Sequence, residues 1–393
     1  MATDQNRTGN LIELAGVFLK LGTTAFGGPA AHIAMMEQEF VQKRQWLSRD
    51  DFLDLLGMAS MIPGPSSTEL AIFIGYRRAG LPGLILGGVC FILPAMLIVT
   101  LIAWLYVKFG ALPNVAGMFY CIKPVIIAIV IQALYGLARS AMKTRSLALL
   151  VIFGTVLCFL EVNQLAILFG AGGIMAAGSW FSQIRERNRK SPDTGTGSIQ
   201  GIMLASGAVG TVAVKTVPFA LWPLFLFFLK IGSILFGSGY VLLAFLRADL
   251  VERWHWLSAG QLLDAIAVGQ ITPGPVFTTA TFIGYLLAGT KGALVATIGI
   301  FLPSFVLVAI SGPIMVRLRQ WKATSAFLDG VNAASLSLMA VVTWQLGREA
   351  LIDPLTMLLA VVSSAALLRY KLNSAWLVIG GATLGLVLPH IFR

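Results

Sequence analysis

The sequence predicts an all-α polytopic membrane protein made of two homologous repeats, each with two broken helical hairpins and about four transmembrane helices. Of its 393 residues, 57% are hydrophobic and 11% are charged, whereas a soluble domain carries about 25% charged residues. Repeated apolar runs approach or exceed the roughly 20 residues that cross a bilayer. Helices interrupted by Gly and Pro also recur at a constant spacing, which indicates an internal duplication.

The first ten residues are polar, and the first apolar run leads into a Gly-Gly-Pro break rather than a small-residue cleavage site. We therefore expect no cleavable signal peptide. The net charge of +11 is interpreted as basic cytoplasmic loops, with attraction of an anionic substrate as the alternative. Cys90, Cys121 and Cys158 lie in apolar runs without metal-ligand spacing, so we expect them to be buried apolar residues.

The first predicted hairpin covers residues 11–40. Its apolar arm, 11–25, has fifteen residues and spans only about 22 Å as a helix, short of the roughly 30 Å hydrocarbon core. The arm ends at Phe26-Gly27-Gly28-Pro29, and the segment after it is too polar to face lipid. These features predict a re-entrant hairpin whose tip is the Gly-Gly-Pro.

The second predicted hairpin covers residues 52–74 and has Pro63-Gly64-Pro65 at its tip. Each Pro removes a backbone donor and clashes with the preceding turn, so a helix cannot continue through the motif. The bare polar groups of such a break must be buried in protein or line a wet cavity. The hairpin ends at the basic pair Arg77-Arg78. A basic loop with Lys43, Arg44 and Arg49 precedes it. The alternative is a single kinked crossing.

Four apolar runs complete each half: 81–107, 115–137, 147–160 and 165–181 in the first, and 293–310, 327–346, 355–368 and 375–391 in the second. We expect an N-terminal repeat over 1–183 and a C-terminal repeat over 219–393. The segment 184–218 between them is expected to be a basic linker. It contains an apolar run, 202–214, that is short for a membrane crossing.

The repeat is defined by motifs that keep register. At an offset of 210, Pro63-Gly64-Pro65 matches Pro273-Gly274-Pro275, and the segment 18–22 matches 228–232. After one deletion the offset is 209, and Pro94 matches Pro303. Duplicated halves with broken helices are typical of secondary transporters, whose binding site lies between the repeats near mid-membrane. Whether the halves are parallel or inverted depends on whether 202–214 crosses.

The breaks are the first candidates for a binding site. A new helix is expected to start after Pro65, and its free amides and positive dipole end form an anion site. The alternative for Ser66 is capping alone, because Ser66 and Glu69 fit a capping box; the second half has Val276 in place of Ser66. The predicted substrate-binding positions at the breaks are Gly27, Gly28, Pro63, Gly64, Pro65, Ser66, Ser67, Thr68, Gly237, Ser238, Pro273, Gly274, Pro275, Thr278 and Thr279.

Lys20 and Lys230 occupy the same repeat position within apolar sequence, six residues before their Phe-Gly break. A cation in such a place is costly unless it is paired or faces a cavity. We therefore include both lysines among the substrate-binding residues, as groups that attract an anion toward the breaks. The alternative is that their charged ends reach the membrane interface.

The candidates for proton or ion coupling are the isolated polar residues His32, Asp54, Glu69, Lys123 and Asp264. A histidine can carry a proton near neutral pH, although a plain hydrogen-bonded histidine is the alternative. Asp54 and Asp264 each precede their Pro by nine residues, where capping or pairing with a basic loop is the alternative to proton coupling. Lys123 aligns with Asn332, so we expect the halves to have unequal duties.

Other function classes lack their motifs here. There is no Walker loop, dinucleotide fingerprint, His/Cys metal spacing, Ser/His/Asp frame or nucleic-acid motif in the sequence,. We therefore expect a protein that is not an enzyme and that has no cofactor, no metal and no nucleic-acid partner. Its partners are expected to be a small anion and the lipid bilayer.

Four motifs carry a family resemblance: the segment 26–34 (FGGPAAHIA), the Pro-Gly-Pro breaks, the segment 236–240 (FGSGY) and the segment 269–280 (GQITPGPVFTTA). Across nearly the whole chain they resemble the chromate ion transporter family, long-chain two-repeat type. The resemblance implies export of chromate, a tetrahedral oxyanion, across the bacterial inner membrane, driven by the membrane potential or an ion gradient.

The resemblance also implies competition by sulfate and inverted halves, because half-length members of the family work in pairs. A homodimer is the candidate assembly. The alternative functions are a transporter of sulfate or another oxyanion and an anion channel, followed by a membrane-embedded enzyme.

Overall fold

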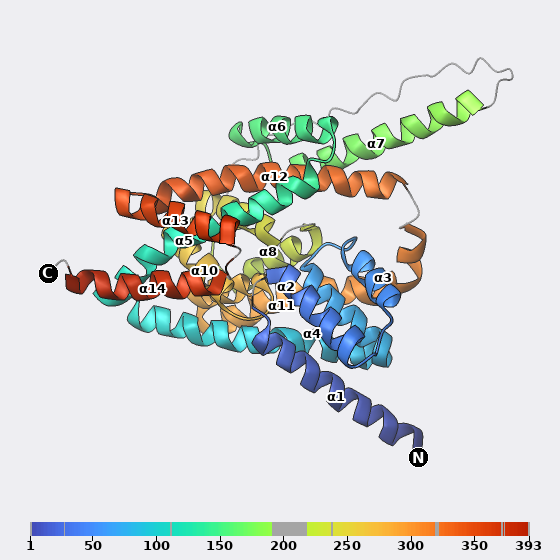
Figure 1. The fold of residues 1–393 in the computed structure, drawn as a ribbon, viewed down its shortest axis with the longest axis horizontal. Coiled ribbons are helices and arrows are strands. Elements are labelled where there is room, and N and C mark those ends of the chain that lie inside the picture. The colour runs from blue at the N-terminus through green and yellow to red at the C-terminus, as the bar shows by residue number, and fades with distance from the viewer. Residues whose placement is uncertain are drawn as a thin grey trace.

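The computed structural model describes residues 2–26, 28–110, 112–190, 218–236, 239–318, 322–370, 372 and 374–391. Within these residues the regular structure is helical (Figure 1). The predicted tip residues Gly27, Gly237 and Ser238 and the short run 202–214 lie outside the described part. The all-α prediction is therefore confirmed, and those four predictions stay open.

The first repeat contains seven α-helices and one π-helical segment in its described part. They are α1 (Ala2–Thr24), α2 (Gly28–Glu37), a π-helix (Gln38–Lys43), α3 (Arg49–Ala59), α4 (Ser66–Phe109), α5 (Pro113–Ala141), α6 (Arg145–Phe159) and α7 (Gln164–Lys190). Helix α7 continues to Lys190 and so takes up the start of the segment predicted as a linker from 184.

The second repeat follows the same order. It comprises α8 (Leu221–Ile234), a short 3-10 turn (Gly239–Val241), α9 (Leu242–Phe245), a π-helix (Leu246–Arg253), α10 (Ala259–Ile271), a second 3-10 turn (Val276–Thr278), α11 (Thr279–Leu318), α12 (Lys322–Ala350), α13 (Pro354–Tyr370) and α14 (Ser374–Ile391). Both repeats therefore carry a π-helix before the second broken hairpin, at matching positions.

Backbone conformation repeats as closely as the sequence motifs do. Helix α4 reverses direction at Ala79 and Gly80, where Gly80 has φ +63° and ψ −146°. Helix α11 reverses at Ala288 and Gly289, where Gly289 has φ +60° and ψ −148°. The arm that starts after each Pro-Gly-Pro break thus folds back before the long apolar helix begins. The structure contains two helix–break–helix units per repeat, and their re-entry into a bilayer stays a prediction.

The two repeats interlock through equivalent helices. Helix α5 packs against α13 and α14, and its counterpart α12 packs against α6 and α7. Small residues allow this close approach: a Cβ on Gly330 would lie 2.5 Å from the carbonyl oxygen of Ala171, and one on Gly385 would lie 2.2 Å from that of Gly117. Such glycine contacts are the usual means by which membrane helices pack.

Equivalent helices run in opposite directions. In Figure 1, α12 begins at the right of the view and ends at the left beside α13, whereas α5, its counterpart at an offset of 209, begins at the left. This is the relationship expected of inverted repeats, in which each half presents its broken helices to the centre from opposite sides.

In the described part of the chain, five helices or helix segments are long and apolar enough to cross a membrane: Ser66–Phe109, Val115–Ala141, Gln164–Ser182, Val276–Ser311 and Ala323–Ala350. Four shorter apolar helices, Arg145–Phe159, Leu221–Ile234, Pro354–Tyr370 and Ser374–Val387, accompany them. Leu93, Leu97 and Leu101 form an exposed row along α4, as a lipid-facing stripe requires. These helices account for the apolar runs that the sequence analysis assigned to crossings.

Candidate functional site

The breaks of the two repeats meet at one centre. The amide of Gly64 donates a hydrogen bond of 2.7 Å to the carbonyl of Leu235, which ends α8 in the second repeat. The amide of Gly274 donates one of 2.9 Å to the carbonyl of Ala25, which follows α1 in the first. Both donors and both acceptors are related by the offset of 210. Each Pro-Gly-Pro break therefore contacts the other repeat's first break.

Only glycine fits at the centre of each Pro-Gly-Pro. Gly64 has φ +136° and Gly274 has φ +92°, conformations that L side chains rarely adopt. A Cβ on Gly64 would lie 2.4 Å from Oε1 of Glu69 and 2.6 Å from Oγ of Ser304, and one on Gly274 would lie 2.7 Å from Cβ of Ala95. The tight fit brings bare backbone to the repeat interface.

A helix starts directly after Pro65, as predicted, with Ser66 as its first residue. The capping box that was the alternative for Ser66 is not formed: the N-cap is Pro65, no side chain caps the helix, and Glu69 instead faces the second repeat. The carboxyl of Glu69 lies beside Gly64, and its Oε1 accepts a hydrogen bond of 3.3 Å from the hydroxyl of Ser304. The first amides of α4 are thus left without a side-chain cap.

His32 ties two breaks of the first repeat together. Its side chain is 1% exposed, with Nδ1 3.2 Å from Oγ of Ser67 and Nε2 3.1 Å from the carbonyl of Ala25. A neutral ring with its proton on Nε2 donates to Ala25 and accepts from Ser67, which satisfies both nitrogens. The arrangement matches a buried, hydrogen-bonded histidine, the alternative given for this residue.

The remaining predicted hydroxyls differ in their bonding. Thr68 is fully buried, and its Oγ1 has no hydrogen-bond partner. In the second repeat, the hydroxyls of Thr278 and Thr279 donate to the carbonyls of Pro275 and Val276, each at 2.8 Å. These two threonines brace their own turn in the present conformation, whereas Thr68 keeps a free hydroxyl.

Glu69 is the acidic residue at the centre. It is 0% exposed. Its Oε1 accepts a hydrogen bond of 3.3 Å from Ser304 of α11, and its Oε2 has no partner. At the offset of 210 the second repeat has Thr279, so only the first repeat has an acid at this position. Ser304 was not predicted from the sequence, although it directly follows the repeated Pro303 where the first repeat has Ala95.

The repeated lysines lie near acids of their own hairpins. Nζ of Lys230 is 3.1 Å from Oδ2 of Asp249 in the π-helix. Lys20 is exposed and interacts electrostatically with Glu39, the residue equivalent to Asp249. The structure thus pairs each repeated lysine with an acid of its own hairpin, and their contact with a substrate stays a prediction.

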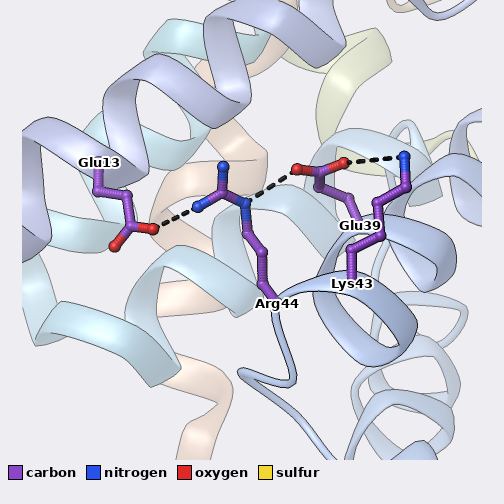
Figure 2. Close-up of polar contacts among 4 residues, drawn as sticks. All are labelled: Glu13, Glu39, Lys43 and Arg44. Atoms are coloured by element: carbon purple, nitrogen blue, oxygen red, sulfur yellow. Dashed lines mark hydrogen bonds and ion pairs between the residues drawn. The ribbon is translucent and has the colours of Figure 1, made fainter.

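A network of charges fixes the outer end of the first hairpin (Figure 2). Arg44 donates to Glu13 of α1 and, through Nε, to Glu39 at 2.9 Å, while Lys43 lies 3.8 Å from the other oxygen of Glu39. The guanidinium therefore joins α1 to the π-helix. This network holds the two arms of the hairpin at their open end, so that the break between them is presented at the centre.

Two predicted coupling residues from different repeats meet. Nζ of Lys123 on α5 is 3.4 Å from Oδ1 of Asp264 on α10, and the hydroxyl of Tyr106 on α4 donates to Oδ2 at 2.8 Å. Asp264 is 5% exposed, whereas its counterpart Asp54 is exposed. The two halves therefore differ as expected, because Asp264 is buried and paired whereas Asp54 is exposed. The contact between Lys123 and Asp264 was not predicted from the sequence.

The polar groups at the centre are backbone amides, hydroxyls, one histidine and one acid. Among the described residues, no three His, Cys, Asp or Glu side chains gather as a metal site would require. In the present conformation the glycine amides are taken up by carbonyls of the opposite repeat. The centre is therefore closed on itself.

Comparison with known proteins agrees with this picture. The chromate transporter family matches residues 12–177 and 222–386, one segment per repeat. A chromate transport protein of Cupriavidus metallidurans is 34% identical over 97% of this chain and 94% of its own length. A probable chromate transport protein of Synechococcus elongatus is 32% identical over 96% of this chain and 95% of its own. No solved structure matches.

A shorter relative bears on the repeat. An uncharacterized transporter of Bacillus subtilis is 28% identical over 190 residues, which are 47% of this chain and 94% of its own length. This relative is therefore about half as long as the present chain. The apolar helices and the family match make this chain a multi-pass protein of the bacterial inner membrane. The chain belongs to the chromate transporter family.

Proposed function

We propose that this protein is a secondary transporter that exports chromate across the inner membrane, and that the four breaks form its substrate site. The observation that carries the proposal is the reciprocal contact at the centre, in which Gly64 and Gly274 donate to carbonyls of the opposite repeat. Two relatives that match over nearly their full length are named a chromate transport protein and a probable chromate transport protein, and these names support the choice of substrate.

The two glycine amides are the donors that a tetrahedral oxyanion would take over. Backbone amides next to a helix start bind anions because the N–H groups point outward and the helix dipole adds positive potential. An oxyanion that accepts from Gly64 and Gly274 displaces the carbonyls of Leu235 and Ala25. Binding therefore loosens the contact between the repeats, and release restores it. This exchange gives the inverted repeats a means to expose the site to either side in turn.

Energy for export is available from the membrane potential. A charge that crosses the membrane gains about 2.3 kcal/mol per 100 mV, and a dianion that leaves a negative interior gains this twice. The proposed drive therefore requires no nucleotide chemistry.

Sulfate is the second candidate substrate. Backbone amides recognise the shape and charge of a tetrahedral dianion and do not by themselves distinguish sulfate from chromate. The described side chains at the centre are one histidine, hydroxyls and one acid. Since none of them is specific for chromate, we expect sulfate to compete with chromate at the same amides.

The test is uptake of radiolabelled chromate into everted membrane vesicles, which converts export into uptake. The wild type should accumulate chromate, and collapse of the membrane potential should abolish accumulation. Replacement of Pro63, Gly64 and Pro65 by alanines should remove uptake, while Gly16→Ala, where a Cβ meets nothing within 4 Å, should leave it unchanged. Full uptake by the triple variant would refute the site, and uptake that persists without the potential would refute the voltage drive.

A further inference from the structure

Glu69 is unusual because no described cation neutralises it. Its side chain is 0% exposed and lies at the contact between the repeats. One carboxyl oxygen accepts a single hydrogen bond of 3.3 Å from Ser304, and the other has no partner. None of the ion pairs among the described residues includes Glu69, whereas the buried Asp264 has both a lysine and a tyrosine.

An ionised carboxylate in such a place is expensive. Its transfer from water into a protein interior costs several kcal/mol even after relaxation, unless a cation or several donors compensate. A single neutral hydroxyl at 3.3 Å does not supply that compensation. The conformation seen here therefore holds Glu69 in its protonated form.

The groups around this turn do not change that conclusion. From α2, the titratable neighbour is His32, which contacts Ser67 and has its second nitrogen on the carbonyl of Ala25. From α11, the contact is the hydroxyl of Ser304. From the break before α4, it is the backbone of Gly64, whose Cβ position lies 2.4 Å from Oε1. None of these contacts brings a cation to the carboxyl.

We propose that Glu69 is a proton-binding gate: the two repeats close over the centre only when Glu69 carries a proton, and their separation exposes the carboxyl and releases that proton to water. The proposal rests on the proposed function, since the contact that closes is the substrate site. The proton comes from the solvent on the side to which the centre was open, one per closure.

The charge of Glu69 also acts on the substrate. In the separated centre, an ionised Glu69 beside the amide of Gly64 repels an oxyanion bound there, because like charges within a few ångströms disfavour one another. This repulsion favours release of the oxyanion before the repeats close again. The gate therefore operates in the first repeat alone, since the second has Thr279 at the equivalent position.

The first test compares the pH dependence of chromate uptake in vesicles of the full chain, at a fixed membrane potential. With one proton required, the wild-type rate should fall about tenfold per pH unit once the open-state Glu69 is ionised. Glu69→Gln, which mimics the protonated form, should transport with a flat profile over the same range. Glu161→Gln, at an exposed turn between α6 and α7, should keep the wild-type profile. A Glu69→Gln variant with the wild-type slope would overturn the proposal.

The second test reads protonation directly in the wild type and needs no variant to fold. Dicyclohexylcarbodiimide, an apolar reagent, modifies protonated carboxyls, and mass spectrometry identifies the modified peptide. In mildly alkaline buffer we expect Glu69 to be labelled and Glu161 to be unlabelled. Absence of label on Glu69 would overturn the gate. If chromate uptake is absent in the wild type while Glu69 is labelled, the proposed function fails and protonation of the closed centre stands.

Discussion

The amide of Gly64 and the carbonyl of Leu235 form a hydrogen bond of 2.7 Å that joins the second break of one repeat to the first break of the other. The same bond recurs between Gly274 and Ala25 at 2.9 Å. Because every atom involved is backbone, the contact depends on the break geometry rather than on a particular side chain. It makes two half-sites into one centre with approximate two-fold symmetry.

The first prediction concerns the glycines of the two breaks. Gly64→Ala and Gly274→Ala should each lower chromate uptake at least tenfold at normal membrane levels, because backbone strain of about 1–3 kcal/mol is added to a steric clash. Gly80→Ala is the matched control, since Gly80 has φ +63° and nothing within 4 Å of its Cβ position. It should show a smaller loss. Equal losses in all three variants would mean that strain alone, and not the fit at the centre, limits transport.

The second prediction concerns the pair that links α5 to α10. Lys123→Met leaves the nearly buried Asp264 without its cation, and loss of one partner of a buried pair costs about 3–5 kcal/mol. The melting temperature of the purified protein in detergent should therefore fall by several degrees. Lys143→Met is the matched control: its pair with Asp329 has the same length of 3.4 Å but side chains 61% and 34% exposed, where a pair contributes about 0–1 kcal/mol. Similar losses in both variants would contradict a structural role specific to Lys123.

The third prediction concerns the repeated lysines. Lys20 and Lys230 are exposed, and each lies near an acid of its own hairpin. We therefore expect them to act on an anion from a distance. Lys20→Ala should raise the chromate concentration needed for half-maximal uptake without changing the maximal rate, and high ionic strength should remove the difference, because salt screens exposed charges. Lys20→Arg should behave as the wild type. Loss of the maximal rate in Lys20→Ala at any salt concentration would instead indicate direct contact with substrate.

Much of the fold could be predicted from the sequence because the informative signals are local. Pro-Gly-Pro stops a helix wherever it occurs, and a constant offset of 210 is visible without a structure. The basic pair Arg77-Arg78 marks the end of the second hairpin in the sequence, and the structure places the break in α4 directly after it, at Ala79 and Gly80. The start of α4 at Ser66 followed from Pro65 alone.

The site was less predictable, for physical reasons. The acceptors at the centre are the carbonyls of Ala25 and Leu235, which any residue could supply. Ser66 and Glu69 match a capping box in sequence, but the approach of Ser304 from α11 redirects the glutamate. Thr278 and Thr279 have the hydroxyls expected of a ligand site, yet their nearest acceptors are carbonyls of their own turn. The backbone acceptors and the position of Glu69 depend on tertiary contacts that a single sequence does not encode locally.

The most direct test of the central claim is a cryo-electron microscopy structure of the full chain in lipid with saturating chromate. We predict density for one tetrahedral anion about 3 Å from the amide nitrogens of Gly64 and Gly274, with both carbonyl contacts to Leu235 and Ala25 broken. Chromate bound elsewhere, with the bonds from Gly64 to Leu235 and from Gly274 to Ala25 intact, would contradict the account.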